Sequence, residues 1–127
     1  MNLENKRILI TGASSGLGKA MAKALISNGA NVLITGRDAD KVKDVAHELG
    51  CWGLASSIAS EDAILALFAA IDSTWGGIDI LINNAGIGYF HPVEEVQWAH
   101  LEEIFHTNVF GAALAGREAA IRMKAQS

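Results

Sequence analysis

The stretch "TGASSGLG" (Thr11–Gly18) places three glycines and two serines between an apolar run and a helical pattern. The preceding run, "RILIT" (Arg7–Thr11), has the branched aliphatic residues typical of a strand buried on both faces. A helix N-terminus offers unpaired N–H groups and a partial positive charge, so a glycine-rich turn that opens a helix favours bound phosphate. The glycines Gly12, Gly16 and Gly18 follow a G-x-x-x-G-x-G spacing. A tight strand-to-helix turn without a ligand is the alternative at this point.

Short apolar runs and helical patterns alternate along the rest of the chain. The further runs are Asn31–Thr35, Cys51–Ile58 and Ile78–Asn83, and the helical patterns between them end at Asn28-Gly29, Gly50 and Gly76-Gly77. Asp38 and Ser60 are the expected N-caps of two of these helices. Residues 95–125 are expected to form one or two more helices. This order predicts an α/β fold, in which a parallel sheet and right-handed crossovers make one domain over residues 1–127.

The composition bounds the class of protein. The chain has 127 residues, half of them apolar, with a formal net charge of −4 and a single cysteine, Cys51. The apolar half excludes a disordered chain, and the lack of clustered Lys and Arg argues against nucleic-acid partners. No apolar run approaches a membrane span, and the N-terminus has no signal-peptide pattern, so we expect a cytoplasmic protein without a membrane partner. The four histidines lack metal-ligand spacing, and we expect no metal site.

A second signal follows the run Asn31–Thr35, where the sequence reads Gly36-Arg37-Asp38. In dinucleotide-binding folds an acid at this strand end accepts a hydrogen bond from the 2′-OH of NAD, whereas a nearby arginine suits the 2′-phosphate of NADP. The guanidinium of Arg37 has the planar fork that matches phosphate. A solvated loop arginine is the alternative. Asp38 would serve NAD if the register differed by one residue, but we expect it to cap the following helix.

A third signal is "NNAG" (Asn83–Gly86), where small and amide residues end a strand beside the expected crevice. The motifs "TGASSGLG", "GR" and "DILINNAG", in this order and at these spacings, resemble the short-chain dehydrogenase/reductase family over essentially the whole chain. The resemblance implies a Rossmann-type, doubly wound parallel sheet of strand order 3-2-1-4 that stops before the family's fifth strand. It also implies hydride transfer between a nicotinamide cofactor and a carbonyl or alcohol.

The resemblance carries the cofactor site over residue by residue. It implies that the dinucleotide is held by Gly12, Ser14, Ser15, Gly16, Leu17, Gly18, Arg37, Ser57, Ile58, Asn84, Ala85 and Gly86. Arg37 would take the 2′-phosphate, so NADP(H) is the preferred cofactor and NAD(H) a possible one. Ser57 and Ile58 stand where the family has Asp-Val, which changes the expected contact with adenine. Asn83 is expected to brace the sheet rather than to touch the cofactor.

By resemblance, Asn108 in "HTNVFG" matches the family's helix asparagine, which kinks its helix and holds a water in the proton relay. Asn108 also shares a helical stripe with apolar residues, so we expect it to point inward as a buried amide. Those residues are Leu101, Ile104, Phe105 and Ala112. The Tyr-x-x-x-Lys pair of the family is not found here, because the single tyrosine, Tyr89, is followed four residues later by Val93. By resemblance, Ser127 stands before the expected fifth strand, so it does not match the family's catalytic Ser.

Two functional classes therefore stay open. The chain is either the N-terminal, NADP(H)-binding part of an oxidoreductase that acts on a small molecule in its full-length form, or a non-catalytic module that binds a nucleotide or a partner. The run Ile78–Asn83 would be an open sheet edge, and family members pair through the helix of Asn108, so we expect a homo-oligomer or an aggregation-prone chain. Trp52, Trp75 and Trp98 are expected to be packing residues. The pairs Glu94-Glu95 and Glu102-Glu103 are expected to be solvated helix faces.

Overall fold

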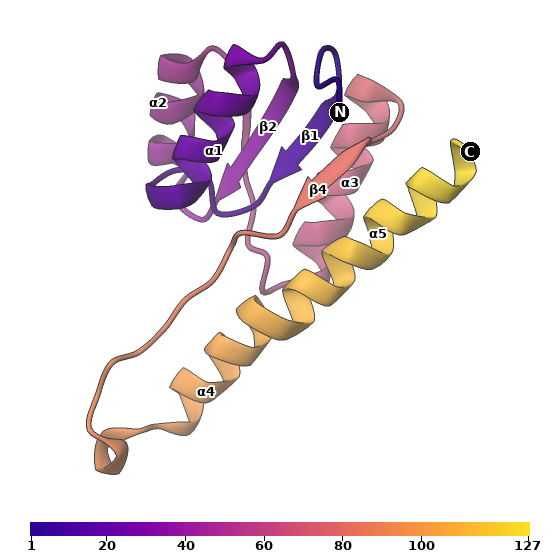
Figure 1. Cartoon of the computed structure of the whole chain (residues 1–127). Coiled ribbons are helices and arrows are strands. Elements are labelled where there is room, and N and C mark those ends of the chain that lie inside the picture. The colour runs from indigo at the N-terminus through magenta and orange to yellow at the C-terminus, as the bar shows by residue number, and fades with distance from the viewer.

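The structure is a computed structural model that describes all residues, 1–127. Four parallel strands form one sheet in the order β3-β2-β1-β4, as the resemblance implies (Figure 1). The strands are β1 (Arg7–Ile10), β2 (Asn31–Gly36), β3 (Trp52–Ala55) and β4 (Ile80–Ile82). β3 and β4 are shorter than their apolar runs, and each lies at a sheet edge and pairs with one neighbour only.

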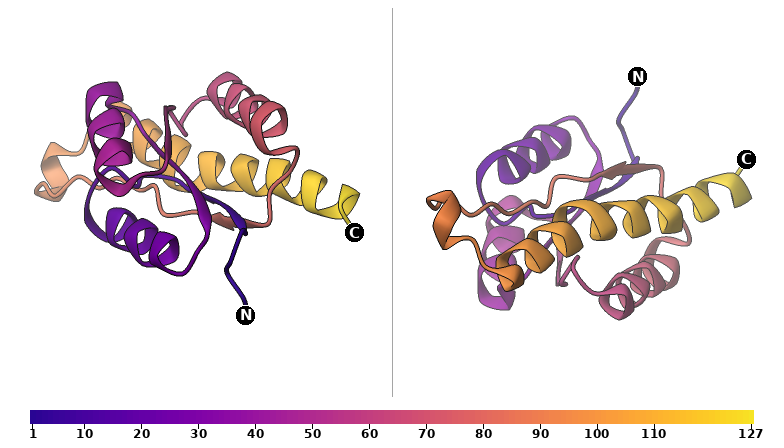
Figure 2. Two further views of the ribbon diagram at one scale, coloured as in Figure 1. Left: turned by 90° about the horizontal axis from the view of Figure 1, so that it is seen from above. Right: turned by 90° about the horizontal axis from the view of Figure 1, so that it is seen from below.

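Helices cover both faces of the sheet. The helices α1 (Gly16–Ser27) and α2 (Ala39–Leu49) lie on one face, and α3 (Glu61–Trp75) and α5 (Ala112–Ala125) lie on the other (Figures 1 and 2). The alternation of side chains along β1 explains the two layers. Ile8 and Ile10 are buried against the α1–α2 layer, whereas Leu9 is buried with Phe68 against the α3–α5 layer. The chain therefore forms the doubly wound fold expected of it.

The predicted helix ends are confirmed at four positions. The Asp38 carboxylate accepts a hydrogen bond from the Lys41 backbone N–H at 3.1 Å, and the Ser60 hydroxyl accepts one from the Ala63 N–H at 3.2 Å. Gly50 and Gly76 end α2 and α3 in the left-handed conformation. These caps satisfy backbone groups that the helices leave unpaired, which fixes where each helix meets the sheet.

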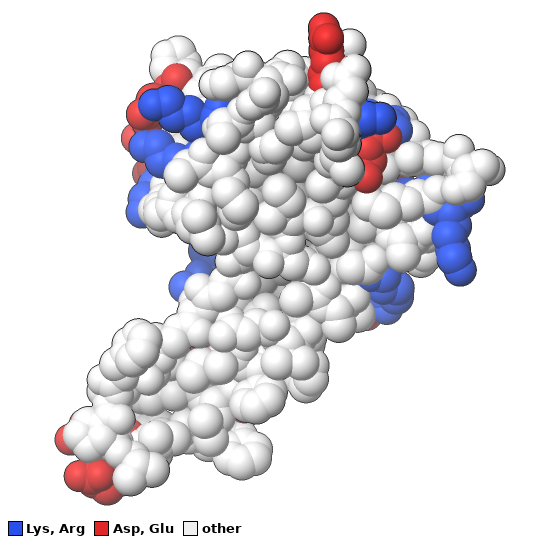
Figure 3. All heavy atoms as spheres, viewed as in Figure 1, with Lys and Arg blue, Asp and Glu red and all other residues white.

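The last helical stretch differs from the simple expectation. After a 3-10 turn, η1 (Val93–Glu95), the helix α4 (Trp98–Phe105) continues through a π-helical segment, η2 (His106–Gly111), into α5. In Figure 1 the loop after β4, η1 and α4 extend well beyond the sheet. Figure 3 shows that the face of this extension turned to the viewer has few charged side chains except for acidic ones at its tip. None of the helices has the length and apolar character needed to cross a bilayer.

The expectation of an inward apolar stripe on this helix is wrong. Leu101 and Phe105 are exposed, Phe105 to 52%, and Trp98 is 77% exposed instead of packed. The pattern does mark one apolar face, but α4 lies beyond the end of the sheet, so that face meets no layer of the core. Trp52 and Trp75 do pack, edge to face, with ring centroids 5.1 Å apart.

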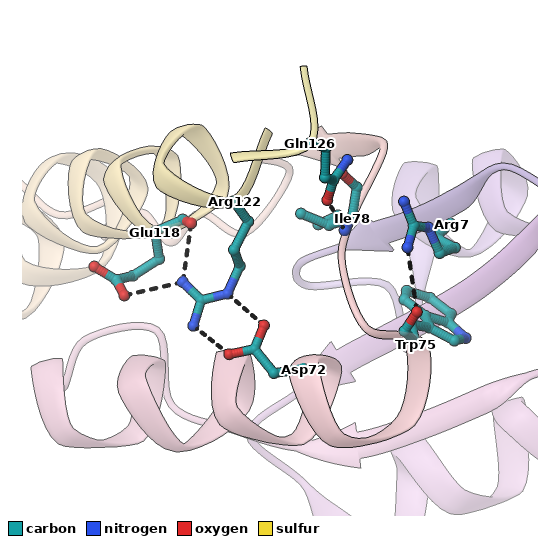
Figure 4. Close-up of polar contacts among 7 residues, drawn as sticks. All are labelled: Arg7, Asp72, Trp75, Ile78, Glu118, Arg122 and Gln126. Atoms are coloured by element: carbon teal, nitrogen blue, oxygen red, sulfur yellow. Dashed lines mark hydrogen bonds and ion pairs between the residues drawn. The ribbon is translucent and has the colours of Figure 1, made fainter. Parts of the chain in front are cut away.

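Polar contacts fasten α5 and the start of β4 to the rest of the fold (Figure 4). Arg122 forms a two-pronged ion pair with Asp72 of α3 at 2.8 Å and also bonds Glu118. The Gln126 side chain accepts from the Ile78 N–H and donates to the Ile78 carbonyl. Arg7 donates to the Trp75 carbonyl at 3.2 Å. These contacts fix the carboxyl-terminal half of the long helix.

Candidate functional site

A polar cleft of about 240 Å³ opens at the carboxyl ends of β1, β2 and β4. In open α/β sheets this edge is where ligands bind. The cleft is lined by Gly12, Ser14, Ser15, Thr35, Gly36, Arg37, Ser56, Ile58, Asn84, Ala85, Gly86, Ile87 and Thr107. The glycine-rich loop, the end of β2 and the "NNAG" stretch, which lie far apart in the sequence, therefore meet at one site.

The sequence-predicted site residues divide into two groups. Most of them line the cleft, namely Gly12, Ser14, Ser15, Arg37, Ile58, Asn84, Ala85 and Gly86. Gly16, Leu17, Gly18 and Ser57 lie outside its lining, where Ser56 takes the place expected of Ser57. Leu17 points to solvent from the first turn of α1 and is 71% exposed. Contact with a cofactor stays a prediction for both groups.

Two glycines allow the first loop to pack directly against the "NNAG" stretch. A Cβ atom on Gly12 would lie 2.7 Å from the Cα of Ala85, and Gly12 has a φ of +64°. A Cβ atom on Gly18 would collide with the side-chain amide of Asn84 and lie 2.8 Å from the Gly12 carbonyl oxygen. Since real Cβ atoms do not approach other atoms so closely, these two positions need glycine for the loop to pack against the "NNAG" stretch, whether or not a ligand is bound.

Thr11 and Asn84 hold the two motifs together by hydrogen bonds. The Thr11 hydroxyl accepts from the backbone N–H groups of Asn84 at 3.2 Å and Ala85 at 3.0 Å. The Asn84 side chain donates to the carbonyls of Thr11 at 3.2 Å and Gly12 at 2.9 Å. The Nδ2 group of Asn84 is therefore engaged with the loop. Sequence reasoning missed Thr11, although a threonine that ends a buried strand is a plain signal for such a role.

Thr107 is a second lining residue that sequence reasoning missed. Its side chain is 4% exposed, and its Oγ1 atom has no hydrogen-bond partner in the protein. Buried polar groups are normally hydrogen-bonded, so this hydroxyl is suited to a polar ligand group in the cleft. The serines of the loop, the Arg37 guanidinium and this hydroxyl are all donors, and such a set fits the phosphate and ribose oxygens of a dinucleotide.

Arg37 reaches across the cleft mouth to α4. Its Nη1 donates to Oε1 of Glu103 at 2.9 Å, and the Tyr89 hydroxyl donates to the other carboxylate oxygen. The bond from Tyr89, with the ion pair to Arg37, holds the pKa of Glu103 below its usual value, and the same bond raises the pKa of the Tyr89 phenol. Glu103 remains partly solvated, as expected, with its side chain 38% exposed, but its carboxylate also joins three separate elements.

Asn108 lies in η2 and is exposed, so the expectation of an inward, buried amide is wrong. Both halves of its amide are nevertheless used. Nδ2 donates to the Ile87 carbonyl and Oδ1 accepts from the Ile87 N–H, each at 2.8 Å. The side chain therefore pairs with the loop after β4, because at this point the helix runs beside that loop and not over the sheet. Asn83, directly after β4, donates from its side chain to the Ala112 carbonyl at the start of α5, at 3.1 Å.

No three His, Cys, Asp or Glu side chains gather in a geometry suited to a metal ion. Tyr89 lies beside the rings of His100 and His91, with 4.4 Å between its centroid and that of His100. These rings form a stacked group on the loop after β4, outside the cleft lining. The cleft itself is lined by hydroxyl groups and the Arg37 guanidinium, donors that suit a polar, anionic ligand.

The strand order and the polar cleft at the strand ends define a Rossmann-type nucleotide-binding fold. Residues 6–127 match the model of the family described as short chain dehydrogenase, and the chain belongs to this family. Proteins of the family use nicotinamide cofactors and act on small molecules.

Relatives and solved structures agree on this assignment. The gluconate 5-dehydrogenase of Gluconobacter oxydans is 37% identical, over 96% of this chain and 50% of its own. The 3-ketoacyl-(acyl-carrier-protein) reductase of Brucella melitensis, solved with NADH, superposes with a TM-score of 0.92 at 38% identity, over 98% of this chain and 52% of its own. A metagenomic short-chain oxidoreductase solved with NADP has the same TM-score at 32% identity, over 99% and 60%. The chain thus spans about half the length of such relatives.

Proposed function

We propose that this chain is the NADP(H)-binding part of an oxidoreductase that transfers hydride between the nicotinamide cofactor and a carbonyl or alcohol group of a small molecule. The observation that carries the NADP preference is the end of β2. Arg37 lines the cleft there, whereas the neighbouring Asp38 carboxylate is engaged with the Lys41 N–H at the start of α2. Arg37 is therefore the charged side chain at the place where the adenosine ribose would lie, and its charge suits a 2′-phosphate.

The other lining residues have matching tasks in this proposal. Ser14 and Ser15 precede the N-terminus of α1 and would bind the pyrophosphate with the free N–H groups of that helix. Ile58 would pack against adenine, and Ala85 and Gly86 would follow the ribose. The bound cofactor supplies the hydride, and the residues of this chain bind and orient it. Gly16, Leu17, Gly18 and Ser57 would add contacts from the edge of the cleft.

Asn108 is proposed as a relay residue only in company with a catalytic Ser and a Tyr-x-x-x-Lys pair, which the 127 residues do not contain. General acid–base catalysis contributes roughly 10²–10⁴-fold to such reactions. We therefore expect the 127-residue chain alone to oxidise NADPH no faster than background with a panel of ketones and aldehydes. Clear turnover by sequence-verified protein would contradict this expectation.

The cofactor preference is tested by calorimetry with NADPH and NADH. The parent chain should bind NADPH more tightly, and Arg37→Ala should weaken NADPH binding by about 10- to 100-fold, the usual worth of a charge-assisted hydrogen bond. NADH binding should change much less. Lys41→Ala removes the same charge from the neighbouring helix and should leave both affinities within about twofold. Equal affinity of the parent chain for the two cofactors would overturn the preference.

The exposed apolar face of α4 and η2 supports a further part of the proposal, self-association of the chain. Trp98, Phe105 and Phe110 are all more than half exposed on this face, and β4 leaves one sheet edge unpaired. Large exposed apolar patches mark interaction sites or aggregation liabilities. Size exclusion with light scattering, at micromolar concentration, should show a dimer or larger species. A compact monomer with a cooperative thermal transition would contradict it.

A further inference from the structure

The ion pair between Arg37 and Glu103 places a negative charge beside the proposed binding site for the 2′-phosphate. Arg37 follows β2, Glu103 lies on α4, and Tyr89, which binds the same carboxylate, lies on the loop after β4. Neither member of the pair is deeply buried, since the Arg37 side chain is 58% exposed and that of Glu103 is 38% exposed. The guanidinium is therefore open to a ligand in the cleft while the carboxylate stays next to it.

We propose that Glu103 is a specificity-determining residue that opposes the 2′-phosphate at Arg37 and so limits the preference for NADP(H) over NAD(H). The proposal deepens the proposed function and rests on it. A phosphate monoester carries nearly two negative charges at neutral pH and would share one guanidinium with a carboxylate. Like charges so close repel each other, whereas the unphosphorylated ribose of NAD(H) carries no charge that Glu103 could repel.

The geometry indicates that Glu103 would stay beside Arg37 and repel a bound 2′-phosphate, rather than give up its place to the phosphate. Glu103 takes one of the five N–H donors of the Arg37 side chain, at Nη1, so the remaining donors can still meet a phosphate. The hydrogen bond from Tyr89 fixes the second carboxylate oxygen to the loop after β4, which restrains Glu103 from turning away. A bound 2′-phosphate must therefore tolerate the Glu103 charge or pull Arg37 away from it, and either event weakens binding.

The test uses two ligands that differ only in the phosphate in question, 2′-phospho-AMP and 5′-AMP, measured by calorimetry. Glu103→Gln keeps the size of the side chain and its oxygen acceptor but removes its charge. It should raise the affinity for 2′-phospho-AMP by about three- to fivefold, as expected of an exposed charge pair at the upper end of its range. The affinity for 5′-AMP should stay within about twofold. The full cofactors, NADPH and NADH, should show the same difference.

Glu102→Gln is the matched control, because it makes the same charge change one residue away on an exposed side chain. It should leave both affinities unchanged within about twofold. In an Arg37→Ala background, Glu103→Gln should no longer raise 2′-phospho-AMP binding, because the shared guanidinium is gone.

Three results would overturn the proposal. A weaker affinity of Glu103→Gln for 2′-phospho-AMP would mean that Glu103 orients Arg37 for the phosphate instead of opposing it. An equal gain in Glu102→Gln would assign the effect to net charge alone. An unchanged affinity for the phosphorylated ligand would show that Glu103 has no part in specificity. If the parent chain bound neither AMP ligand and neither cofactor, the proposed function would fail as well.

Discussion

The sheet with α1, α2, α3 and α5, here called the body, differs sharply from the arm, residues 87–111, which comprises the loop after β4, η1, α4 and η2. Both apolar core clusters lie in the body. In the arm only Thr107 and Gly111 are buried, although it carries several large apolar side chains. Apolar side chains are thus buried in the body and exposed in the arm, depending on whether a second layer of the fold packs against them.

Different forces hold the two regions. Burial of apolar area stabilises the body, at roughly 25 cal/mol per Å². Polar side chains hold the arm: the Asn108 amide binds Ile87 and the Glu103 carboxylate binds Tyr89 within it, and the ion pair of Glu103 with Arg37 joins it to the body. Exposed hydrogen bonds and ion pairs contribute much less than a packed core. We therefore expect the arm to open locally at far lower cost than the body.

The largest expected effect comes from truncating one phenylalanine in each region. Phe68 has 0% exposure in the α3–α5 layer, so Phe68→Ala should lower the free energy of unfolding by about 3–5 kcal/mol. Phe105→Ala in the arm should change it by no more than about 0.5 kcal/mol, since the ring is half exposed already. Urea unfolding followed by circular dichroism measures both. Similar losses from the two substitutions would remove the distinction between body and arm.

A smaller effect is expected at the ion pair that joins β1 to the start of β4. Arg7 binds Asp79 with two parallel hydrogen bonds, at 2.9 and 3.0 Å, and lowers the pKa of Asp79 from 3.8 to about 2. Asp79→Asn should therefore lower the free energy of unfolding by about 1–2 kcal/mol at neutral pH, allowing for partial exposure of the pair.

The pH dependence of this pair has a definite sign. Because the folded-state pKa of Asp79 is depressed, its contribution is fully present above the unfolded value of 3.8 and is lost as the pH falls toward about 2. Unfolding titrations between these limits should show a steeper loss of stability in the parent chain than in Asp79→Asn. Parallel pH profiles would contradict the role assigned to the pair.

The smallest expected effect is a rise in the free energy of unfolding, and it concerns a glycine in α5. Gly116 lies inside α5, and a Cβ atom there would meet nothing within 4 Å. Gly116→Ala should therefore raise the free energy of unfolding by about 0.5–1 kcal/mol, because alanine loses less backbone entropy in a helix. Ala120→Gly, at an exposed position of the same helix, is the reverse control and should lower it by a similar amount. A destabilising Gly116→Ala would indicate that α5 packs more tightly than described.

The sequence predicted the body well because local signals and burial agree there. Branched aliphatic runs became strands, and Asp38, Ser60, Gly50 and Gly76 end the helices where expected. The arm was predicted less well, because a helical period shows which face is apolar but not whether anything covers it. The inward placement of Asn108 failed for this reason.

Contacts between distant elements account for the other differences at the site. Glu103 and Arg37 are separated by 66 residues, and their meeting depends on the direction in which α4 leaves the sheet. The lining position of Ser56, in place of Ser57, depends on where β3 ends, which an apolar run fixes only to within a residue or two. The glycine-rich loop, Arg37 and "NNAG" were recognisable because each motif carries its own local chemistry.

The most direct test of the central claim, that the cleft at the strand ends holds NADP(H), is an amide NMR titration of the parent chain with NADP⁺. The account predicts that the largest shift changes fall on the backbone amides of Gly12, Ser14, Arg37 and Gly86, with the amide of Trp98 on the apolar face of the arm unaffected. Saturable shifts confined to the arm, or no shifts at the cleft amides at millimolar NADP⁺, would contradict it.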